Sequence, residues 1–290
     1  MPQIKRQLPP SNRTNSVHIV DLFESAVAVS ELPMSGMKVL VFGLSGTGKT
    51  TYGSTFPKPL LVIRPEEVEE GTKSISTVSG VFVSPPITDP DQLDQIVQGQ
   101  RSTKRYKTIV LDGITRFQDH VIRKHMGWQD VAVQLTYGSV PQTDWNAIGL
   151  TLKQHMRDLL RLAEDGTHIV LIGGERTVGE TDNKNVILAQ PTIMVNLTPG
   201  TSGFIHEICD YNFHTFKRRK VERRVKDMAG KKVTVDVQTD EMEFCMHITE
   251  QELYGTKFRR PKSYKVPPEI SDPSYDKIAA LVQEAEKHGV

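Results

Sequence analysis

The chain has 290 residues, of which 37% are hydrophobic and 24% are charged. This composition is that of a folded globular protein and excludes a wholly disordered chain, and the length allows one large domain or one domain with appendages. The net charge is only +1, but residues 217–232 carry a net +7, residues 257–265 a net +5, and the rest of the chain −11. The basic C-terminal third is therefore expected to face an anionic partner, either nucleic acid or nucleotide phosphate, or to form a solvated basic hairpin.

The sequence pattern excludes two further classes of protein. No apolar run approaches the roughly 18 residues that cross a bilayer, and the N-terminus lacks the apolar stretch of a signal peptide, so a cytoplasmic protein without a membrane partner is predicted. The two cysteines, Cys209 and Cys245, are isolated from each other and from any His-rich cluster. They predict buried structural thiols, because neither a disulfide framework nor a zinc site fits that spacing.

Strands and helices are expected to alternate through most of the chain. After an N-terminal arm of residues 1–35, short apolar runs predict strands at 38–42, 60–63, 81–83, 108–111 and 168–172. Helices are predicted between them, after residue 48, at 91–98, at 115–126 and from Asp144 to Gly166. Such alternation predicts an α/β fold in which a mostly parallel sheet lies between helices and binds ligands at its carboxyl edge.

The pattern changes after residue 212. Alternating segments at 213–225 and 233–238, with Ala229-Gly230 as the turn, predict a basic β-hairpin. A last helix is predicted at 275–287. The predicted domains are thus the arm (1–35), a core (36–212) and a C-terminal hairpin extension (213–290).

One motif carries most of the chemistry. Residues 43–50 read GLSGTGKT and match the phosphate loop G-x-x-x-x-G-K-[ST] at every fixed position, directly after a predicted strand. The glycines let successive amides point at phosphate oxygens, Lys49 supplies a positive charge, and the Thr50 hydroxyl can ligate Mg²⁺. We therefore predict a site for ATP and Mg²⁺. Its ligands are expected to be Gly43, Ser45, Gly46, Thr47, Gly48, Lys49, Thr50 and Thr51.

Carboxylates elsewhere are candidates to complete this site. Asp112 ends an apolar strand after the phosphate loop and is predicted to hold the Mg²⁺ shell together with Thr50. A group that polarises the attacking water is also needed, and Glu66 or Glu67, after the strand at 60–63, is the candidate. The alternative is that these glutamates only solvate the start of a helix.

The chain resembles the phage-encoded nucleotide-binding proteins of the RecA-like superfamily, which include ATPases associated with single-strand annealing. The likeness covers roughly residues 37–215 and is carried by the segments 39–51, 60–71, 106–117, 136–138 and 169–176. It implies a RecA-like core, ATP with Mg²⁺, a homo-oligomeric ring or filament, and a role on single-stranded DNA in phage recombination or replication, in the cytoplasm of the bacterial host. It also suggests a single-strand DNA-binding protein as a partner.

The resemblance adds roles for residues beyond the phosphate loop. Glu175 joins Lys49 and the two glutamates in the predicted catalytic set, because such proteins carry a γ-phosphate sensor at that strand end; its alternative is an ion pair with Arg176. Two polar loops, 127–142 and 176–203, would contact DNA, the first through Trp128 and Tyr137. The alternative is that both loops are plain connections and that Trp128 packs against the core.

Basic residues after Asp210 have two competing roles. In RecA-like assemblies such residues reach the ATP of a neighbouring subunit, whereas a groove for single strands would combine them with aromatic residues. The basic candidates are Lys217, Arg218, Arg219, Lys220, Arg223 and Arg224, and the interleaved aromatic residues are Phe213, Phe216, Phe258 and Tyr264.

Three functions are compatible with these features. The first is an ATPase that binds single-stranded DNA and assists annealing or strand exchange. The second is a P-loop kinase acting on a nucleotide or another small molecule, and the third is a nucleotide-gated structural or interaction protein with little hydrolysis. The basic residues lie on strand-like segments and not in an Arg-rich lid between short helices, which favours the first.

Overall fold

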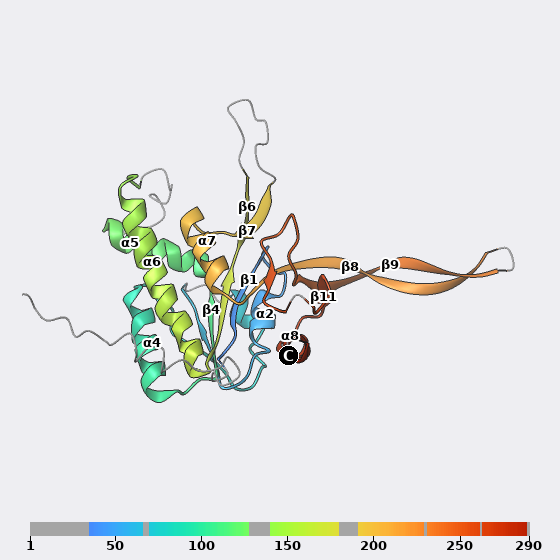
Figure 1. The fold of residues 1–290 in the computed structure, drawn as a ribbon, viewed down its shortest axis with the longest axis horizontal. Helices are drawn as coiled ribbons and strands as arrows, with labels where there is room; N and C mark the ends of the chain where they lie inside the picture. The colour runs from blue at the N-terminus through green and yellow to red at the C-terminus, as the bar shows by residue number, and fades with distance from the viewer. Residues whose placement is uncertain are drawn as a thin grey trace, which may run out of the picture. The chain divides into compact units, whose positions relative to one another are not determined.

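The computed structural model describes residues 35–65, 70–127, 140–179, 191–228, 231–261 and 263–288 (Figure 1). In chain order the elements are β1 (Lys38–Gly43), α2 (Lys49–Gly53), β2 (Leu60–Ile63), α3 (Glu70–Lys73), β3 (Val81–Val83), α4 (Asp91–Thr103), β4 (Thr108–Asp112), α5 (Ile114–Met126), α6 (Asp144–Leu160), the 3₁₀ helix Arg161–Asp165, β5 (His168–Gly173), β6 (Glu175–Val178), β7 (Thr192–Val195), α7 (Pro199–Ile208), β8 (Tyr211–Met228), β9 (Lys231–His247), β10 (Lys257–Phe258), β11 (Glu269–Ser271) and α8 (Tyr275–Lys287).

The main sheet has the strand order β11-β9-β8-β1-β5-β4-β2-β3, with β10 paired to β8. Each strand from β8 to β3 in this order is parallel to its neighbours in the series. The carboxyl ends of these strands therefore meet at one edge, with β5 between the strand that precedes the phosphate loop and the strand that carries Asp112. The predicted α/β class with a mostly parallel sheet is confirmed.

Helices cover both faces of the sheet (Figure 1). Successive residues of a strand point to opposite faces, and in β1 Leu40 and Phe42 join the core under α4, α5, α6 and α7. Val39 and Val41 join the second core, which contains residues of α2 and α8. A sheet buried on both faces explains why its strands read as continuous apolar runs in the sequence.

The predicted hairpin is formed by β8 and β9. They pair antiparallel from His214↔His247 to Met228↔Lys231, with an irregularity between Arg219 and Val221. The base of this hairpin belongs to the main sheet, because β1 pairs with β8 along 211–215 and β11 pairs with β9 along 245–247. The predicted domain boundary between residues 212 and 213 thus falls inside a strand of the core sheet. Past that base, within the described residues, the two strands pair only with each other and leave the sheet as a ribbon (Figure 1).

The segment after β5 differs from the prediction of a long loop at 176–203. β6 and β7 form a separate antiparallel pair, and α7 starts at Pro199. Proline is frequent in the first turn of helices, so this residue was an available signal. Residues 1–34 of the predicted arm, Trp128, Tyr137 and the turn at Ala229-Gly230 lie outside the described residues.

Two further expectations can be compared with the structure. Cys209 and Cys245 are both buried free thiols, as predicted. Within the described part of the chain, every helix is too short or too polar to pass through a lipid bilayer.

Candidate functional site

The loop between β1 and α2 presents backbone groups at the carboxyl edge of the sheet. Gly46 and Gly48 have φ angles of +72° and +85°, a region that favours glycine. Gly48 directly precedes α2 and provides no side-chain cap to its first amides. Consecutive amides in such a turn form a concave surface that binds anions. Ser45 and Thr51 are exposed, whereas Thr47 is buried and donates to the Leu44 carbonyl at 2.8 Å.

Thr50 and Asp112, the two predicted metal ligands, lie together. The hydroxyl of Thr50, on α2, donates a 2.7 Å hydrogen bond to Oδ2 of Asp112, the last residue of β4. Burial raises the pKa of Asp112, and the hydrogen bond from Thr50 and the charge of Lys49 oppose that rise. A hydroxyl and a half-buried carboxylate are oxygen ligands of the kind that Mg²⁺ prefers, so this pair fits the predicted metal.

Gly71 of α3 lies against the same two oxygens. A Cβ placed on this glycine would lie 3.0 Å from Oγ1 of Thr50 and 3.1 Å from Oδ2 of Asp112. The backbone of α3 can approach the side chains of Thr50 and Asp112 this closely only because residue 71 has no side chain. Sequence reasoning did not identify Gly71 as a site residue, because a lone glycine after an acidic cluster carries no motif.

Lys49 is folded onto its own loop. Its Nζ donates to the carbonyls of Gly43 at 2.9 Å and Leu44 at 2.5 Å. Burial lowers its pKa, while the charges of Asp112 and Glu175 oppose the shift. The ammonium thus contacts the phosphate loop, where phosphate oxygens can replace the carbonyls as its partners.

Glu175 is paired with a residue that the sequence analysis did not single out. Its Oε2 lies 2.7 Å from Nε2 of His214 on β8, so its partner is this histidine. Burial lowers the pKa of His214, and the bond to Glu175 opposes that effect. The imidazole also stacks on Tyr254, with 4.3 Å between ring centroids. The predicted sensor is therefore fixed to the base of the hairpin.

The other predicted catalytic residues, Glu66 and Glu67, lie outside the described residues. The strand before them, β2, is parallel to β4, with Ile63 opposite Leu111. The chain therefore leaves β2 at the sheet edge that carries Asp112.

The base of the hairpin contacts the phosphate loop of the same chain. Thr215 Oγ1 lies 2.7 Å from Thr47 Oγ1, and this contact is buried. Lys217 Nζ would lie 3.5 Å from a Cβ placed on Gly46. β8 thus places one of the predicted basic residues beside its own nucleotide site.

The other basic residues of the hairpin are mostly matched by carboxylates. Arg218 binds Glu243 at 2.5 Å and also pairs with Glu269. Lys220 and Arg223 pair with acidic residues of β9 at 3.2 and 3.5 Å, Arg219 is exposed, and the Arg224 side chain lies outside the described part. The four acidic residues in 233–247 lower the net charge from +7 over 217–232 to +3 over 217–247.

The expected groove of aromatic residues between the two basic clusters does not form. Phe213 and Phe258 are buried in the core, and Phe216 stacks on His247 at 4.2 Å. Tyr264 donates to Glu284 at 2.6 Å. Phe213 and Phe258 thus serve the core, and Phe216 and Tyr264 each pack on a different neighbour.

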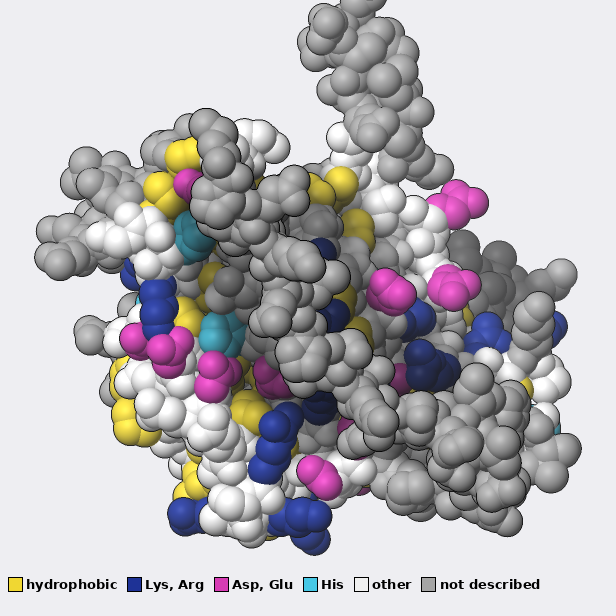
Figure 2. All heavy atoms as spheres, turned by 60° about the vertical axis from the view of Figure 1, so that its left-hand side comes forward, with side chains coloured by type: hydrophobic (Ala, Val, Ile, Leu, Met, Phe, Trp, Pro, Cys, Tyr) yellow, Lys and Arg dark blue, Asp and Glu magenta, His cyan; other side chains and the backbone are white. Residues whose placement is uncertain are grey.

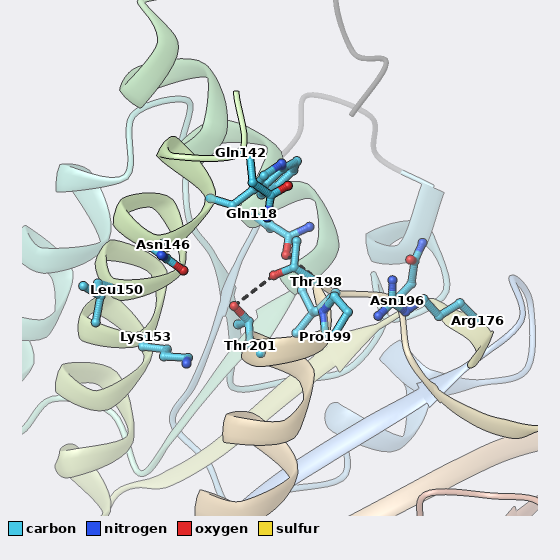
Figure 3. A pocket seen from close by; sticks show the side chains of 14 residues that line it. Gln118, Gln142, Asn146, Leu150, Lys153, Arg176, Asn196, Thr198, Pro199 and Thr201 are labelled. Atoms are coloured by element: carbon cyan, nitrogen blue, oxygen red, sulfur yellow. Dashed lines mark hydrogen bonds between the residues drawn. The ribbon is translucent and has the colours of Figure 1, made fainter. Parts of the chain in front are cut away.

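A pocket of about 810 Å³ lies between the segment of α6 from Trp145 to Lys153 and the first turn of α7, beside β6 and the end of β7 (Figure 3). Lys153 and Arg176 contribute positive charge to its wall, and Trp145 contributes an aromatic ring. Thr198 precedes α7 and bonds Thr201 at 3.1 Å. Amide side chains complete the lining, namely Gln118, Gln142, Asn146 and Asn196. The pocket was not predicted, because it requires β7 and α7, which were read as a loop.

Comparisons with known proteins place these features in a family. The family described as "AAA domain" matches residues 35–243, which include the phosphate loop, Asp112, Glu175 and β8. A comparison with curated protein sequences finds no match. Among solved structures, the chain is similar to a KaiC-like protein from the hyperthermophilic archaeon Pyrococcus horikoshii OT3, with 14% identity and a TM-score of 0.39, over 82% of this chain and 91% of that chain.

Proposed function

Because this chain belongs to the AAA domain family, we propose that it is a Mg²⁺-dependent ATPase that acts on single-stranded DNA as a homo-oligomer. The observation that carries the nucleotide part is the phosphate loop next to the 2.7 Å contact between Thr50 and Asp112. ATP hydrolysis requires cations and amides on the phosphates, a metal held by oxygen ligands, and a group that orients water.

The residues of this chain would divide these tasks. The amides of residues 43–51 and the Lys49 ammonium would bind the phosphates, and Thr50 and Asp112 would hold Mg²⁺, which neutralises developing charge on the phosphoryl oxygens. Glu175, fixed by His214, lies within electrostatic range of Lys49 and would respond to the terminal phosphate. Glu66 and Glu67 remain the candidates to orient the attacking water.

The pocket between α6 and α7 is the surface that best supports binding of a nucleic acid strand. Lys153 and Arg157 of α6 both lie over the ring of Phe204, at 5.9 and 5.2 Å, so positive charge continues from the pocket along the helix. Cations bind the DNA backbone, while amides and an aromatic ring such as Trp145 suit exposed bases. The described ends of the predicted loops at 127–142 and 176–203 supply Gln142 and Arg176 to the pocket wall.

Other surfaces support DNA binding less well. On the side of the molecule that carries α4, α5 and α6, acidic and basic side chains are interspersed (Figure 2). Lys124, for example, pairs with Asp89 at 2.8 Å and Asp91 at 2.6 Å. The resemblance to phage annealing ATPases supports a ring or filament, a role in phage recombination or replication, and cooperation with a single-strand DNA-binding protein.

The test is phosphate release from Mg·ATP, measured with and without single-stranded DNA over a salt series. We expect stimulation by DNA that fades as salt is added, because phosphate contacts release counterions. Lys49→Ala should abolish nucleotide binding. The double variant Lys153→Glu/Arg176→Glu should weaken DNA binding and reduce its salt slope by roughly 0.7 for each lost contact with a single strand.

Matched variants separate the possible results. Lys287→Glu changes an exposed lysine outside the pocket and outside both basic clusters, and it should leave the salt slope unchanged. Arg219→Glu/Arg223→Glu tests the ribbon in the same assay; a larger loss of DNA binding there than in the pocket variant would move the DNA site to the ribbon. Turnover that DNA does not change would favour the kinase, and nucleotide binding without phosphate release would favour the nucleotide-gated protein.

A further inference from the structure

A lysine and a phenylalanine at the base of the hairpin rest together on the phosphate loop. Lys217 and Phe244 are direct cross-strand partners, and the ammonium lies 5.3 Å from the centre of the ring. The ring lies against Gly48, where an added Cβ would meet Cδ1 at 3.1 Å. The ammonium lies beside Gly46, 3.5 Å from the corresponding Cβ position. Both side chains thus contact the glycine turn that would surround the phosphates.

The pairing of Lys217 differs from that of its neighbours on β8. Arg218 and Lys220 each bind a carboxylate, whereas the cross-strand partner of Lys217 is an aromatic ring. Among the described residues, Lys217 forms no ion pair within 4.0 Å, and it is exposed. A cation over an exposed ring gains only about 0.5–1 kcal/mol, so this contact is easily exchanged for an anion.

The strand that carries Lys217 is nevertheless held firmly at the loop. Thr215, two residues earlier, has its hydroxyl oxygen 2.7 Å from that of Thr47 and 3.3 Å from the Phe42 carbonyl oxygen. β8 is also hydrogen-bonded to β1 as far as Gly43. An ammonium on a flexible four-carbon stem, carried by a strand that is hydrogen-bonded to β1, is suited to reach an anion at the loop without displacing the hairpin.

We propose that Lys217 is, after Lys49, a second cation that binds phosphate within its own subunit. Its ammonium leaves the Phe244 ring and binds the terminal phosphate of a nucleoside triphosphate. The inference rests on the proposed nucleotide site. It adds that Lys217 lets this site distinguish a nucleoside triphosphate from a diphosphate. The resemblance to RecA-like assemblies leads to the opposite expectation, that basic residues of this strand serve the neighbouring subunit. The position of Lys217 beside Gly46 of the same chain favours action within one subunit.

Binding measured by calorimetry tests discrimination without turnover. We expect Lys217→Ala to lose about tenfold in affinity for a non-hydrolysable ATP analogue, as for one charge-assisted hydrogen bond, and to keep its affinity for ADP. Lys217→Arg should recover part of the loss. Lys287→Ala, at an exposed lysine outside the site and outside both basic clusters, should bind both ligands like the wild type. Equal losses for both ligands, or no loss, would overturn the proposal, provided that thermal unfolding shows the variant folded.

Mixing two defective variants distinguishes action within one subunit from action between subunits. Lys49→Ala lacks a working phosphate loop but keeps Lys217, and Lys217→Ala has the reverse defect. If Lys217 served a neighbour, adding Lys49→Ala protein would restore tight binding of a fluorescent ATP analogue to Lys217→Ala protein. We expect no restoration, and restoration would overturn the proposal. Failure of the proposed function itself is recognised separately, because the wild type would then bind no Mg·ATP.

Discussion

Nε2 of His214 lies 2.7 Å from Oε2 of Glu175, and this contact joins β8 to β6 beside the phosphate loop. Both side chains are largely buried, with exposed fractions of 5% for His214 and 16% for Glu175. The histidine therefore acts as a positioning residue that holds a carboxylate near Lys49. Its ring stack on Tyr254 extends this arrangement toward the C-terminal segment.

We expect the substitutions Glu175→Gln and His214→Phe to be non-additive. Phenylalanine keeps an aromatic ring against Tyr254 but cannot bind the carboxylate. A double-mutant cycle in urea should give a coupling free energy on the order of 1 kcal/mol. In phosphate-release assays, His214→Phe should lower kcat about as much as Glu175→Gln does, and the double variant should lose little more. Additive effects in both measurements would contradict the positioning role.

Metal affinity should depend on pH through Asp112. Only the ionised carboxylate binds Mg²⁺ well, and burial raises the pKa of this group. We expect Mg²⁺ affinity, titrated in the presence of ADP, to fall with acidification at a higher pH than for an ordinary aspartate near 3.9. Asp112→Asn should bind Mg²⁺ weakly and lose this pH dependence. The same weak, flat titration in the wild type would argue against Asp112 as a ligand.

In the metal-free protein, the raised pKa of Asp112 makes acid favour the folded state, whereas acid weakens Mg²⁺ binding. The folded carboxyl binds a proton more tightly than the unfolded chain does, so its contribution to stability is present at low pH. That contribution is lost as the pH rises through the folded pKa. Mg²⁺ should therefore stabilise the protein most above that pH.

We expect Gly71→Ala to weaken Mg²⁺ binding while the protein stays folded. The added methyl group would lie 3.0 Å from the Thr50 oxygen and 3.1 Å from the Asp112 oxygen. Either α3 or these two side chains therefore have to shift. Gly99→Ala is the matched control, since a Cβ at that position of α4 meets nothing within 4 Å. It should raise the unfolding free energy by roughly 0.8–1.0 kcal/mol and leave metal affinity unchanged. Equal metal affinities in the two variants would contradict the role of Gly71.

Acid should destabilise the protein partly through His206. Burial, followed by the charge of Lys257, lowers its pKa from 6.5 to about 4. A group whose folded pKa is depressed stabilises the fold above its unfolded pKa, so this contribution is lost as the pH falls from 6.5 toward 4. We expect His206→Gln to flatten the pH dependence of the unfolding free energy by roughly 1–3 kcal/mol over that range. His288→Gln, at an exposed position, should leave the curve nearly unchanged.

The predictions from sequence succeeded where a signal was local. The buried strands at 38–43, 60–63 and 108–112 are continuous apolar runs, and their order around the phosphate loop gave the fold class. The proximity of Thr50 and Asp112 followed from a motif and a strand end, and their role as metal ligands stays a prediction. The antiparallel strands β6 and β7 were missed because Glu175–Val178 and Thr192–Val195 are short and polar in part.

Other features of the site depend on contacts between distant segments. His214 and Lys217 lie at the phosphate loop because β8 is the neighbour of β1 in the sheet. This pairing joins positions more than 160 residues apart in the sequence; Thr47 and Thr215, for example, are separated by 168 residues. No local pattern reports that pairing. Likewise, the basic run at 217–220 gave no indication that β9 would supply carboxylates to Arg218 and Lys220.

The ribbon of β8 and β9 has a consequence for how this protein can vary in length. Beyond Arg219, its described residues pair only with one another, up to Met228↔Lys231. Removing or adding two residues in each strand preserves which face every side chain occupies and changes the reach by about 7 Å, while the contact of Thr215 with Thr47 stays in place. Variants with shorter or longer strands are therefore expected to differ in the reach of the hairpin and to keep its contact with the phosphate loop.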